Sequence, residues 1–424
     1  MFQKIKRVFY FAAAWYFRIF AEIKLQRWNP RIIVITGSSG KTTLLHLIES
    51  QLGDIAKYSH HANSSIGIPF DILNIHRQDL TLTEWPGIFL SAPFRMFSKV
   101  PKEKIYVVEA DCDRPYEGDF LSSFLRPEVT LWTNVSRTHS MNFDPLVESG
   151  KFKRLEDAIA YEYGFFAERT TNLVVINADN PFELDEIKRA TAKIEKVSVS
   201  NSLRNYSIES EKTEFDFGDL VIRFKYLMPE ETAVSILMTR ILLDYLGIKF
   251  DKSFNSFELP PGRNSMFRGI KGITIIDSTY NANLDSMTAV LNMFSKIKSN
   301  NKWVVLGDML EQGKNEPEEH KNLAKMVSKF DFKRVILLGP RVSAYTYPEL
   351  KKLIDNSVLI EHYINPKDVL EYLMKNLKGG EIILFKGARF LEGVIENLLE
   401  DKNDRVKLSR REKIWEIRRK KWGL

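Results

Sequence analysis

The 424-residue sequence contains one cysteine, Cys112, no low-complexity tract and no hydrophobic run of membrane-spanning length. A single cysteine excludes an internal disulfide and a zinc ribbon that needs several thiolates, and it indicates a chain of the reducing cytoplasm. The uncharged run Val8–Phe17 has ten residues, about half of what a spanning helix needs. No small-residue cleavage site follows it, which argues against a secretory signal peptide.

The positive charge of the chain is concentrated at its two ends. The whole sequence carries a formal net charge of +7. Residues 1–30 hold six basic residues against one acidic residue, and residues 401–424 hold ten against four, so the remaining body is slightly acidic. A nucleic-acid-binding body would carry a basic face of its own, and we therefore expect no nucleic-acid partner.

The N-terminal segment combines the aromatic run Val8–Phe17 with basic flanks. Such a helix suits the interface of an anionic bilayer, where aromatic rings enter the headgroup region and cations surround them. A helix that packs on its own protein is the alternative, and the sequence leaves both open. The first interpretation predicts a cytoplasmic protein that is peripheral at the inner membrane face and attracted to it through both termini.

Hydrophobic patterning predicts two α/β domains joined near residue 260. Apolar runs typical of buried parallel strands alternate with helical stretches on both sides of the polar segment Glu258–Asn264. The strands expected are Arg31–Thr36, Ile105–Ala110, Val129–Asn134, Leu173–Asn177, Gly272–Asp277, Trp303–Asp308, Val335–Gly339, Val358–His362 and Glu381–Lys386. The expected order is an N-terminal helix (1–30), a central parallel-sheet domain (31–260), a second α/β domain (261–400) and a basic tail (401–424).

The clearest motif is TGSSGKTT, residues 36–43, between the first expected strand and a helix at Lys41–Leu52. Backbone N–H groups of a glycine-rich loop and the positive end of the helix bind phosphate oxygens. Ile35 stands where the full Walker pattern has its first glycine, but the strand–loop–helix context favours nucleotide binding. The residues predicted to contact the nucleotide are Gly37, Ser38, Ser39, Gly40, Lys41, Thr42 and Thr43.

Candidate metal ligands follow two neighbouring strands. Glu109 ends the second expected strand, where a carboxylate that holds Mg²⁺ belongs. Asp111, Asp113 and Glu117 lie close by in sequence, so the region is better defined than the residue. His139 follows the third strand, although a lone histidine is more often a packed or surface residue than a ligand.

Taken together, the motifs resemble those of the ATP-dependent Mur ligases over about residues 31–400. The order DSTYNAN and then LGDMLEQG is similar to the branch of that family that adds D-alanyl-D-alanine. The matching stretches are TGSSGKTT from Thr36, NSSIGIP from Asn63, VVEA from Val107, TNVSRTH from Thr133, VVINADN from Val174, GRN from Gly262, IIDSTYNANLDSM from Ile275, VVLGDMLEQG from Val304 and KGAR from Lys386.

The resemblance implies a central nucleotide-binding P-loop domain followed by a Rossmann-like domain that receives the incoming amine. It implies an ATP- and Mg²⁺-dependent peptide ligase that forms an acyl phosphate and adds D-alanyl-D-alanine or a similar amine to a cell-wall peptide precursor. The roles it implies are Lys41 and Thr42 at the phosphates and metal, Glu109 and His139 as Mg²⁺ ligands, Arg263 reaching ATP on closure, Asp277 on the ribose, Tyr280 and Asn281 against the nucleotide, and Lys386 seating the incoming substrate.

The sequence departs from the family pattern in three places. Only about 30 residues precede the first strand, where the family normally has an N-terminal domain, or at least residues, that hold the uridine nucleotide; we therefore expect the usual UDP-binding domain to be lacking. A family lysine that is carbamylated and bridges two Mg²⁺ ions aligns with Glu162, or with Tyr163 if Gly164 alone anchors the alignment. A glutamate could replace the carbamate, so Glu162 is a predicted metal and catalytic residue. Ser235 and Ala388 replace an asparagine that contacts adenine and a serine after the late Lys-Gly pair.

Two other functions stay open at this point. The same chemistry could act on another acceptor, such as a polyglutamate-type or lipid-linked acid. A non-catalytic nucleotide-binding membrane adaptor is the second alternative, which the retained lysine, histidine and arginine of the motifs disfavour.

Overall fold

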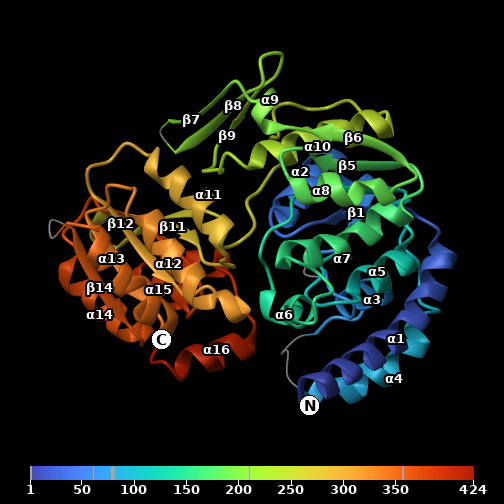
Figure 1. The fold of residues 1–424 in the computed structure, drawn as a ribbon, viewed down its shortest axis with the longest axis horizontal. Coiled ribbons are helices and arrows are strands. Elements are labelled where there is room, and N and C mark those ends of the chain that lie inside the picture. Colours follow the sequence, from blue (N-terminus) through green and yellow to red (C-terminus); the bar gives the residue numbers. More distant parts are fainter. Residues whose placement is uncertain (1, 61, 78–81, 210, 356–357) are drawn as a thin grey trace. The chain divides into compact units, whose positions relative to one another are not determined.

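The computed structural model describes residues 2–60, 62–77, 82–209, 211–355 and 358–424, and its contacts divide the chain into two units (Figure 1). The first unit joins Met1–Ser202 to Thr232–Glu258, and the second joins Leu203–Glu231 to Leu259–Leu424. A single break near residue 260 does not describe this division, because the segment Leu203–Glu231 groups with the C-terminal unit.

The first unit is built on a six-stranded, fully parallel sheet with the order β2-β3-β1-β4-β5-β6. Its central strand β1 leads directly into the glycine-rich loop, and β3 and β4 pair with it on either side. The strands are β1 (Arg31–Thr36), β2 (Ala56–Tyr58), β3 (Ile105–Glu109), β4 (Val129–Trp132), β5 (Leu173–Asn177) and β6 (Lys193–Val197). Loops that follow β1, β3 and β4 therefore meet at one edge of the sheet.

Helices cover both faces of this sheet. Ile32 and Val34 of β1 pack with α1, α3, α4, α5 and α7, whereas Ile33 and Ile35 pack with α2 and α10. A strand that is buried on both faces accounts for the continuous apolar run RIIVI. The helices are α1 (Phe2–Trp28), α2 (Lys41–Leu52), α3 (Gly67–Leu73), α4 (Trp85–Arg95), α5 (Glu117–Leu125), α6 (Ser140–Glu148), α7 (Leu155–Arg169), α8 (Pro181–Glu186), α9 (Val199–Ser202) and α10 (Thr232–Leu246).

Helix α1 packs along one face on its own unit. It contacts α3 and α4, and the Tyr16 hydroxyl donates a hydrogen bond of 2.9 Å to the Phe89 carbonyl of α4. Its buried apolar side chains are Ala14, Phe17, Ala21, Leu25 and Trp28. The alternative in which this helix packs on its own protein is thus confirmed for this face.

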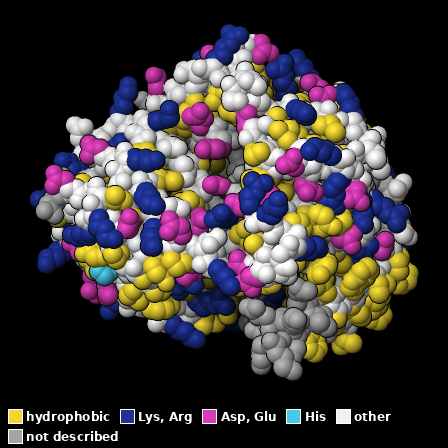
Figure 2. All heavy atoms as spheres, in the orientation of Figure 1, with side chains coloured by type: hydrophobic (Ala, Val, Ile, Leu, Met, Phe, Trp, Pro, Cys, Tyr) yellow, Lys and Arg dark blue, Asp and Glu magenta, His cyan; other side chains and the backbone are white. Residues whose placement is uncertain are grey.

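The opposite face of the same helix pair is apolar and exposed (Figure 2). We call it the α1–α4 face, made of Phe9, Trp15, Ile19 and Ile23 of α1 with Leu90, Phe94 and Phe97 of α4 and the turn after it. Leu90, Phe94 and Phe97 are 67% to 79% exposed. None of the helices in the described part of the chain combines the length and the hydrophobicity that crossing a bilayer requires.

The second unit contains a six-stranded sheet with the order β10-β11-β15-β12-β13-β14, in which only β10 is antiparallel to its neighbour. It also holds the antiparallel meander β7-β8-β9, which the sequence analysis did not predict. The strands are β7 (Asn205–Glu209), β8 (Lys212–Asp216), β9 (Val221–Phe224), β10 (Ser265–Gly269), β11 (Ile273–Ser278), β12 (Lys302–Gly307), β13 (Arg334–Leu338), β14 (Leu359–Tyr363) and β15 (Ile382–Lys386). The helices are α11 (Leu284–Ser295), α12 (Glu316–Val327), α13 (Tyr347–Leu353), α14 (Pro366–Asn376), α15 (Leu391–Leu398) and α16 (Lys413–Lys420).

The predicted α/β class with parallel sheets is confirmed in both units. Each strand expected from the apolar runs is present within two residues of its predicted ends. Strands β2, β6 and β10 were not predicted. Each lies at the edge of its sheet, where weaker burial leaves a weaker hydrophobic pattern.

Candidate active site

The glycine-rich loop lies between β1 and α2, and the segment that leaves β4 holds it in place. Gly37 has a φ of 122°, and a Cβ atom there would lie 2.4 Å from Thr133 Oγ1. The Ser39 N–H donates to Asn134 Oδ1 over 2.8 Å, and Thr133 Oγ1 donates to the Ser39 carbonyl over 2.7 Å. The loop therefore needs glycine at 37 for two reasons: its backbone angle and the close approach of Thr133.

Ser38 joins the loop to the segment after β4 at a second point. Its hydroxyl donates to the Ser136 carbonyl over 3.0 Å and accepts the Ser136 N–H over 2.9 Å. Gly40 also has a positive φ, of 85°, and precedes α2. The loop is thus fixed in shape at the N-terminus of a helix, the arrangement that binds phosphate.

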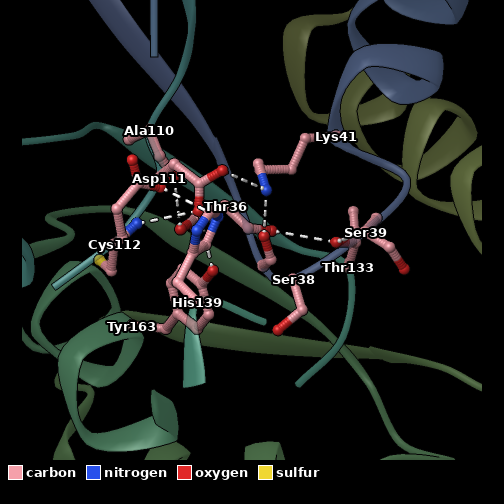
Figure 3. Close-up of polar contacts among 12 residues, drawn as sticks. Thr36, Ser38, Ser39, Lys41, Ala110, Asp111, Cys112, Thr133, His139 and Tyr163 are labelled. Carbon is pink, nitrogen blue, oxygen red and sulfur yellow. Dashed lines mark hydrogen bonds and ion pairs between the residues drawn. The ribbon is translucent and has the colours of Figure 1, made fainter. Parts of the chain in front are cut away.

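Lys41 opens α2 and points back over the loop (Figure 3). Its ammonium hydrogen-bonds the Gly37 carbonyl and lies 2.9 Å from Asp111 Oδ2. Lys41 is only 7% exposed. A charge buried to this extent needs an anion, and Asp111 supplies it within the protein.

Asp111, Asp113 and His139 form the group that we call the acidic cluster. One ligand atom from each lies within 4.8 Å of the other two, and His139 Nε2 is 3.1 Å from Asp113 Oδ1. Tyr163 of α7 donates its hydroxyl to Asp111 Oδ1 over 3.0 Å (Figure 3). Asp111 and Asp113 follow β3 and His139 follows β4, so the cluster lies at the carboxyl edge of the parallel sheet, beside Lys41.

Burial and charge act in opposite directions on the two aspartates. Burial tends to raise the pKa of Asp111, but the charges of Lys41 and His139 outweigh it and hold that pKa below its ordinary value. Burial raises the pKa of Asp113, and nearby Asp111 adds to the rise while His139 opposes it. Titratable groups whose pKa values are displaced by burial and by nearby charges cluster at functional sites.

His139 is held in a backbone conformation that is uncommon for a residue with a side chain. Its φ is 52°, in the left-handed region, and it is the residue directly before α6. Non-glycine residues in this region cluster at functional sites. The conformation places the imidazole at Asp113 rather than along the helix.

Glu109 and Glu117 lie outside the acidic cluster. Glu109 ends β3 beside Ile35 of β1, and its backbone N–H donates to Ser59 Oγ over 2.9 Å. Glu117 is fully buried and accepts hydrogen bonds from the Tyr10 hydroxyl and from the Arg114 backbone N–H. The assignment of Glu109 as a metal ligand stays a prediction, and Glu117 connects α1 to the start of α5.

Glu162 faces the start of α5. Its Oε1 accepts the Tyr116 N–H over 2.9 Å and its Oε2 accepts the Gly118 N–H over 3.0 Å. Glu162 is 3% exposed and is not a member of the acidic cluster. The side chain of α7 that reaches the cluster is Tyr163, the residue given by the alternative alignment on Gly164. The bridging role of Glu162 stays a prediction, and these contacts support a structural one.

The predicted residues of the second unit lie close to one another in that unit. The Arg263 guanidinium lies over the Tyr280 ring, 4.4 Å from its centroid. Lys386 Nζ donates to the Asn281 carbonyl over 3.1 Å, and Lys386 pairs in register with Ser278, next to Asp277. Burial, with a contribution from the Arg263 charge, lowers the pKa of Lys386 to about 7.

Asp277 is fully buried in the same region of the second unit. It accepts the Thr279 N–H and the Thr279 hydroxyl, over 3.0 and 2.7 Å. Burial raises the pKa of Asp277 to about 6, although these hydrogen bonds lower it. The structure thus brings together Arg263, Asp277, Tyr280, Asn281 and Lys386, whose individual roles stay predictions.

One buried ionic group of the second unit was not predicted from the sequence. Asp308 is fully buried and accepts the backbone N–H groups of Arg341 and Val342, each over 3.0 Å. Arg389 Nε donates to Asp308 Oδ2 over 2.8 Å. The signal was present in the sequence, because Asp308 and Arg389 belong to the stretches LGDMLEQG and KGAR.

The donor set of the first unit fits Mg²⁺. Carboxylate oxygens and a threonine hydroxyl at a phosphate-binding loop are the ligands that this ion takes. Asp111 and Asp113 supply the carboxylates, and Thr42 follows the loop lysine at the first turn of α2.

Comparison with known proteins gives two matches to family domains along the chain. Residues 35–236 match the domain described as "Mur ligase middle domain". Residues 262–389 match the domain described as "Mur ligase, glutamate ligase domain". The two matches cover most of the chain in the order of the two units.

Curated relatives and solved structures agree with these matches. The UDP-N-acetylmuramoyl-tripeptide–D-alanyl-D-alanine ligase of Borreliella burgdorferi is 25% identical over 87% of this chain and 74% of its own length. The enzyme of the same name from Bacillus subtilis is 25% identical over 90% of this chain and 78% of its own length.

Among solved structures, MurF from Acinetobacter baumannii matches with a TM-score of 0.72 at 17% identity, over 90% of this chain and 79% of its own. The MurF ligase from Thermotoga maritima in complex with ADP matches with a TM-score of 0.70 at 20% identity, over 92% of this chain and 83% of its own. These likenesses show the fold over 90% to 92% of this chain.

Proposed function

The chain belongs to the Mur ligase family, and on that premise we propose that it is an ATP-dependent amide ligase that adds D-alanyl-D-alanine to a cell-wall peptide precursor. The observation that carries the proposal is the convergence of Lys41, the clamped glycine-rich loop and the acidic cluster at one edge of the first sheet. The curated relatives named above carry that activity in their names.

In the proposed reaction an oxygen of the acceptor carboxylate attacks the terminal phosphorus of ATP. The bond from that phosphorus to its bridging oxygen breaks, and ADP leaves. The neutral amine of the incoming substrate then attacks the acyl carbon, inorganic phosphate leaves, and the amine nitrogen loses a proton as the amide forms. Catalysis of such a transfer rests mainly on positioning and on electrostatic stabilisation.

The first unit supplies the phosphate-binding side of this chemistry. The loop N–H groups and the Lys41 ammonium stabilise the negative charge of the transferred phosphoryl group. Asp111, Asp113, His139 and the Thr42 hydroxyl would hold Mg²⁺, which neutralises phosphate charge when bound. The ion pair between Lys41 and Asp111 keeps the lysine over the loop before the phosphates arrive.

The second unit supplies the groups for the nucleoside and for the incoming substrate. We propose that Asp277 binds the ribose, that Tyr280 and Asn281 lie against the nucleotide, and that Arg263 contacts the phosphates. Lys386, buried and hydrogen-bonded to the Asn281 carbonyl, would take the carboxylate of the amine substrate. An anion at Lys386 favours the charged form of the lysine, which its burial disfavours.

The experiment that tests this function measures phosphate release from ATP and the mass of the product with defined substrates. UDP-N-acetylmuramoyl-tripeptide and D-alanyl-D-alanine together should give phosphate release and a product with the mass of the amide, and neither substrate alone should do so. Lipid-linked and polyglutamate-type acids form the second arm of the screen. If the chain turned over one of these acids but not UDP-N-acetylmuramoyl-tripeptide, it would still be a ligase, but the proposed acceptor would be wrong.

We further propose that the α1–α4 face rests on an anionic membrane surface. Its exposed aromatic and aliphatic side chains are suited to the interfacial region of a bilayer. Exposed basic residues lie on the same two helices and in the segment after α4: Arg27, Arg95, Lys99, Lys102 and Lys104. The apolar surface and its positive surroundings are complementary to acyl chains beneath anionic headgroups.

The C-terminal tail contributes less to this attraction than its composition predicts. Arg411 pairs with Glu396 over 2.6 Å and Lys420 pairs with Glu416 over 2.7 Å. Arg410 lies 3.4 Å from buried Glu392. Basic side chains that are paired within their own unit add less to long-range attraction than unpaired ones.

Co-sedimentation with anionic and neutral vesicles tests the membrane proposal. Leu90→Ser with Phe94→Ser should lower the bound fraction several-fold, and raised salt should lower it further because it screens the basic residues. Ile55→Ser is the control, because Ile55 is exposed on the first unit away from these helices. Binding that the double substitution leaves unchanged, or no binding by the parent chain, would overturn the proposal.

A further inference from the structure

A second group of potential metal ligands lies on the first unit, separate from the acidic cluster. His46 and Glu49 are three residues apart on α2 and so share one side of that helix. His60 comes two residues after β2 and lies against them, with its ring centroid 5.1 Å from that of His46. The chain returns from α2 through β2, and this return brings the three side chains together.

The three side chains lie close enough together to share one metal ion. His60 Nε2 is 3.0 Å from Glu49 Oε1, and His46 Nδ1 is 3.6 Å from Glu49 Oε2. One ligand atom from each residue lies within 4.8 Å of the others. Nitrogen and oxygen ligands at about 2.0–2.2 Å from a tetrahedral zinc ion lie about 3.3–3.6 Å from one another. The ligand atoms would draw together from separations of up to 4.8 Å to surround such an ion.

We propose that His46, Glu49 and His60 bind a divalent transition-metal ion of the Zn²⁺ class, with solvent in the remaining position. Two imidazoles and one carboxylate suit zinc, whereas Mg²⁺ selects oxygen ligands and an octahedral shell. The acidic cluster has two carboxylates and one imidazole, whereas this group has two imidazoles and one carboxylate, so the two groups differ in the metal ion they favour. The three side chains are 23% to 37% exposed, so a metal ion can reach them from solvent.

An ion bound there would link two segments of the first unit that lie near the glycine-rich loop and β3. It would join α2, whose first residue is Lys41, to the segment after β2. His60 follows Ser59, whose hydroxyl accepts the Glu109 N–H over 2.9 Å and whose N–H donates to the Val107 carbonyl over 3.1 Å. An ion that binds the folded chain but not the unfolded chain would raise the thermal stability by mass action.

Metal titration of the full chain, stripped by a chelator and kept free of nucleotide, tests the proposal. With excess Mg²⁺ present to occupy the acidic cluster, calorimetry with Zn²⁺ should show a saturable site, and Zn²⁺ should raise the melting temperature above the value that Mg²⁺ alone gives. We expect His60→Ala and Glu49→Gln each to weaken zinc binding by at least about tenfold. Loss of a residue that only supports a metal ligand already lowers metal affinity by about 10- to 100-fold, and loss of the ligand itself should lower it at least as much.

His76→Ala is the matched control, because His76 is exposed on the same unit and hydrogen-bonds Asn74. It should bind Zn²⁺ as the parent chain does. Glu49→Gln keeps the shape of the site, so it serves if His60→Ala fails to fold. Equal zinc binding by the parent chain and both ligand variants would overturn the proposal, as would equal losses in all three variants.

Discussion

Lys41 Nζ lies 2.9 Å from Asp111 Oδ2, so the lysine of the phosphate-binding loop and the acidic cluster are directly joined. The pair stabilises both charges in a place where water is largely excluded. The phosphates of a nucleotide offer Lys41 an alternative anion, and a divalent cation offers Asp111 an alternative cation. In the proposed site, the ion pair would thus link phosphate binding to metal binding at this edge of the sheet.

Replacement of the loop lysine tests the phosphate-binding side. Lys41→Ala should lower the rate of ATP turnover by about 100-fold or more, because removing a group that stabilises transition-state charge costs several kcal/mol. Lys188→Ala is the control, since Lys188 is 75% exposed and pairs with the similarly exposed surface residue Asp185. Near-normal turnover by a folded Lys41→Ala protein would contradict the assignment.

Glu162→Gln separates the two roles offered for Glu162. The amide keeps one acceptor oxygen, but its NH₂ group faces a backbone N–H, so we expect a loss of about 1–3 kcal/mol in the free energy of unfolding. If Glu162 only holds the backbone N–H groups of Tyr116 and Gly118, the variant's rate should depend on Mg²⁺ concentration as the parent chain's rate does. A shift of that curve to higher Mg²⁺ would instead favour the bridging role. Glu168→Gln, at an exposed position of the same helix, controls for the charge change.

Arg263 is predicted to act on the transferred phosphate rather than on the metal. Arg263→Ala should lower kcat by about 100-fold while leaving the Mg²⁺ dependence nearly unchanged. The control is Arg268→Ala, an exposed arginine on β10 in the same unit. Equal effects of the two substitutions on kcat would show that Arg263 has no special part in the reaction.

Lys386 predicts a pH dependence of stability whose sign follows from its lowered pKa. Burial lowers that pKa to about 7, whereas the unfolded chain has a value of about 10.4. Between these values the unfolded state binds more protons, so the free energy of unfolding rises with pH. Below about pH 7 the folded protein bears the full cost of the buried charge.

Lys386→Met removes this charge at similar volume. The variant should therefore melt at a higher temperature than the parent chain near neutral pH, and the difference should shrink toward pH 10. Lys271→Met, in the same unit and hydrogen-bonded at the surface to the Met374 carbonyl, should lack this trend. A difference in melting temperature that is constant with pH would contradict the account of Lys386.

Much of this arrangement could be predicted from sequence because local pattern determines it. The buried strand Arg31–Thr36 and the glycines at 37 and 40 indicate a tight loop between a strand and a helix, and the structure has such a loop there. Phosphate binding by this loop stays a prediction. The motifs around Asp277 and Lys386 lie on neighbouring strands of one sheet, so their proximity follows from register. Parallel strands carry the residues after them to a common edge.

Side-chain direction and burial of charged groups were harder to predict. Adjacent positions on a helix point about 100° apart, so a shift of one residue separates Glu162, which binds backbone, from Tyr163, which reaches Asp111. Arg18 ends the uncharged run of α1, and Lys24 lies further along the same helix. Both are buried with partners, Arg18 at the Phe120 carbonyl and Lys24 at Ser98 Oγ, and a sequence pattern does not reveal such partners.

The most direct test of the central claim is the dependence of phosphate release on both substrates. With ATP and Mg²⁺, the chain should release phosphate only when a carboxylate acceptor and an amine are both present, and one amide should form per phosphate. Lys41→Ala should abolish both signals together. Phosphate release that needs neither substrate, or release without formation of an amide, would contradict the account.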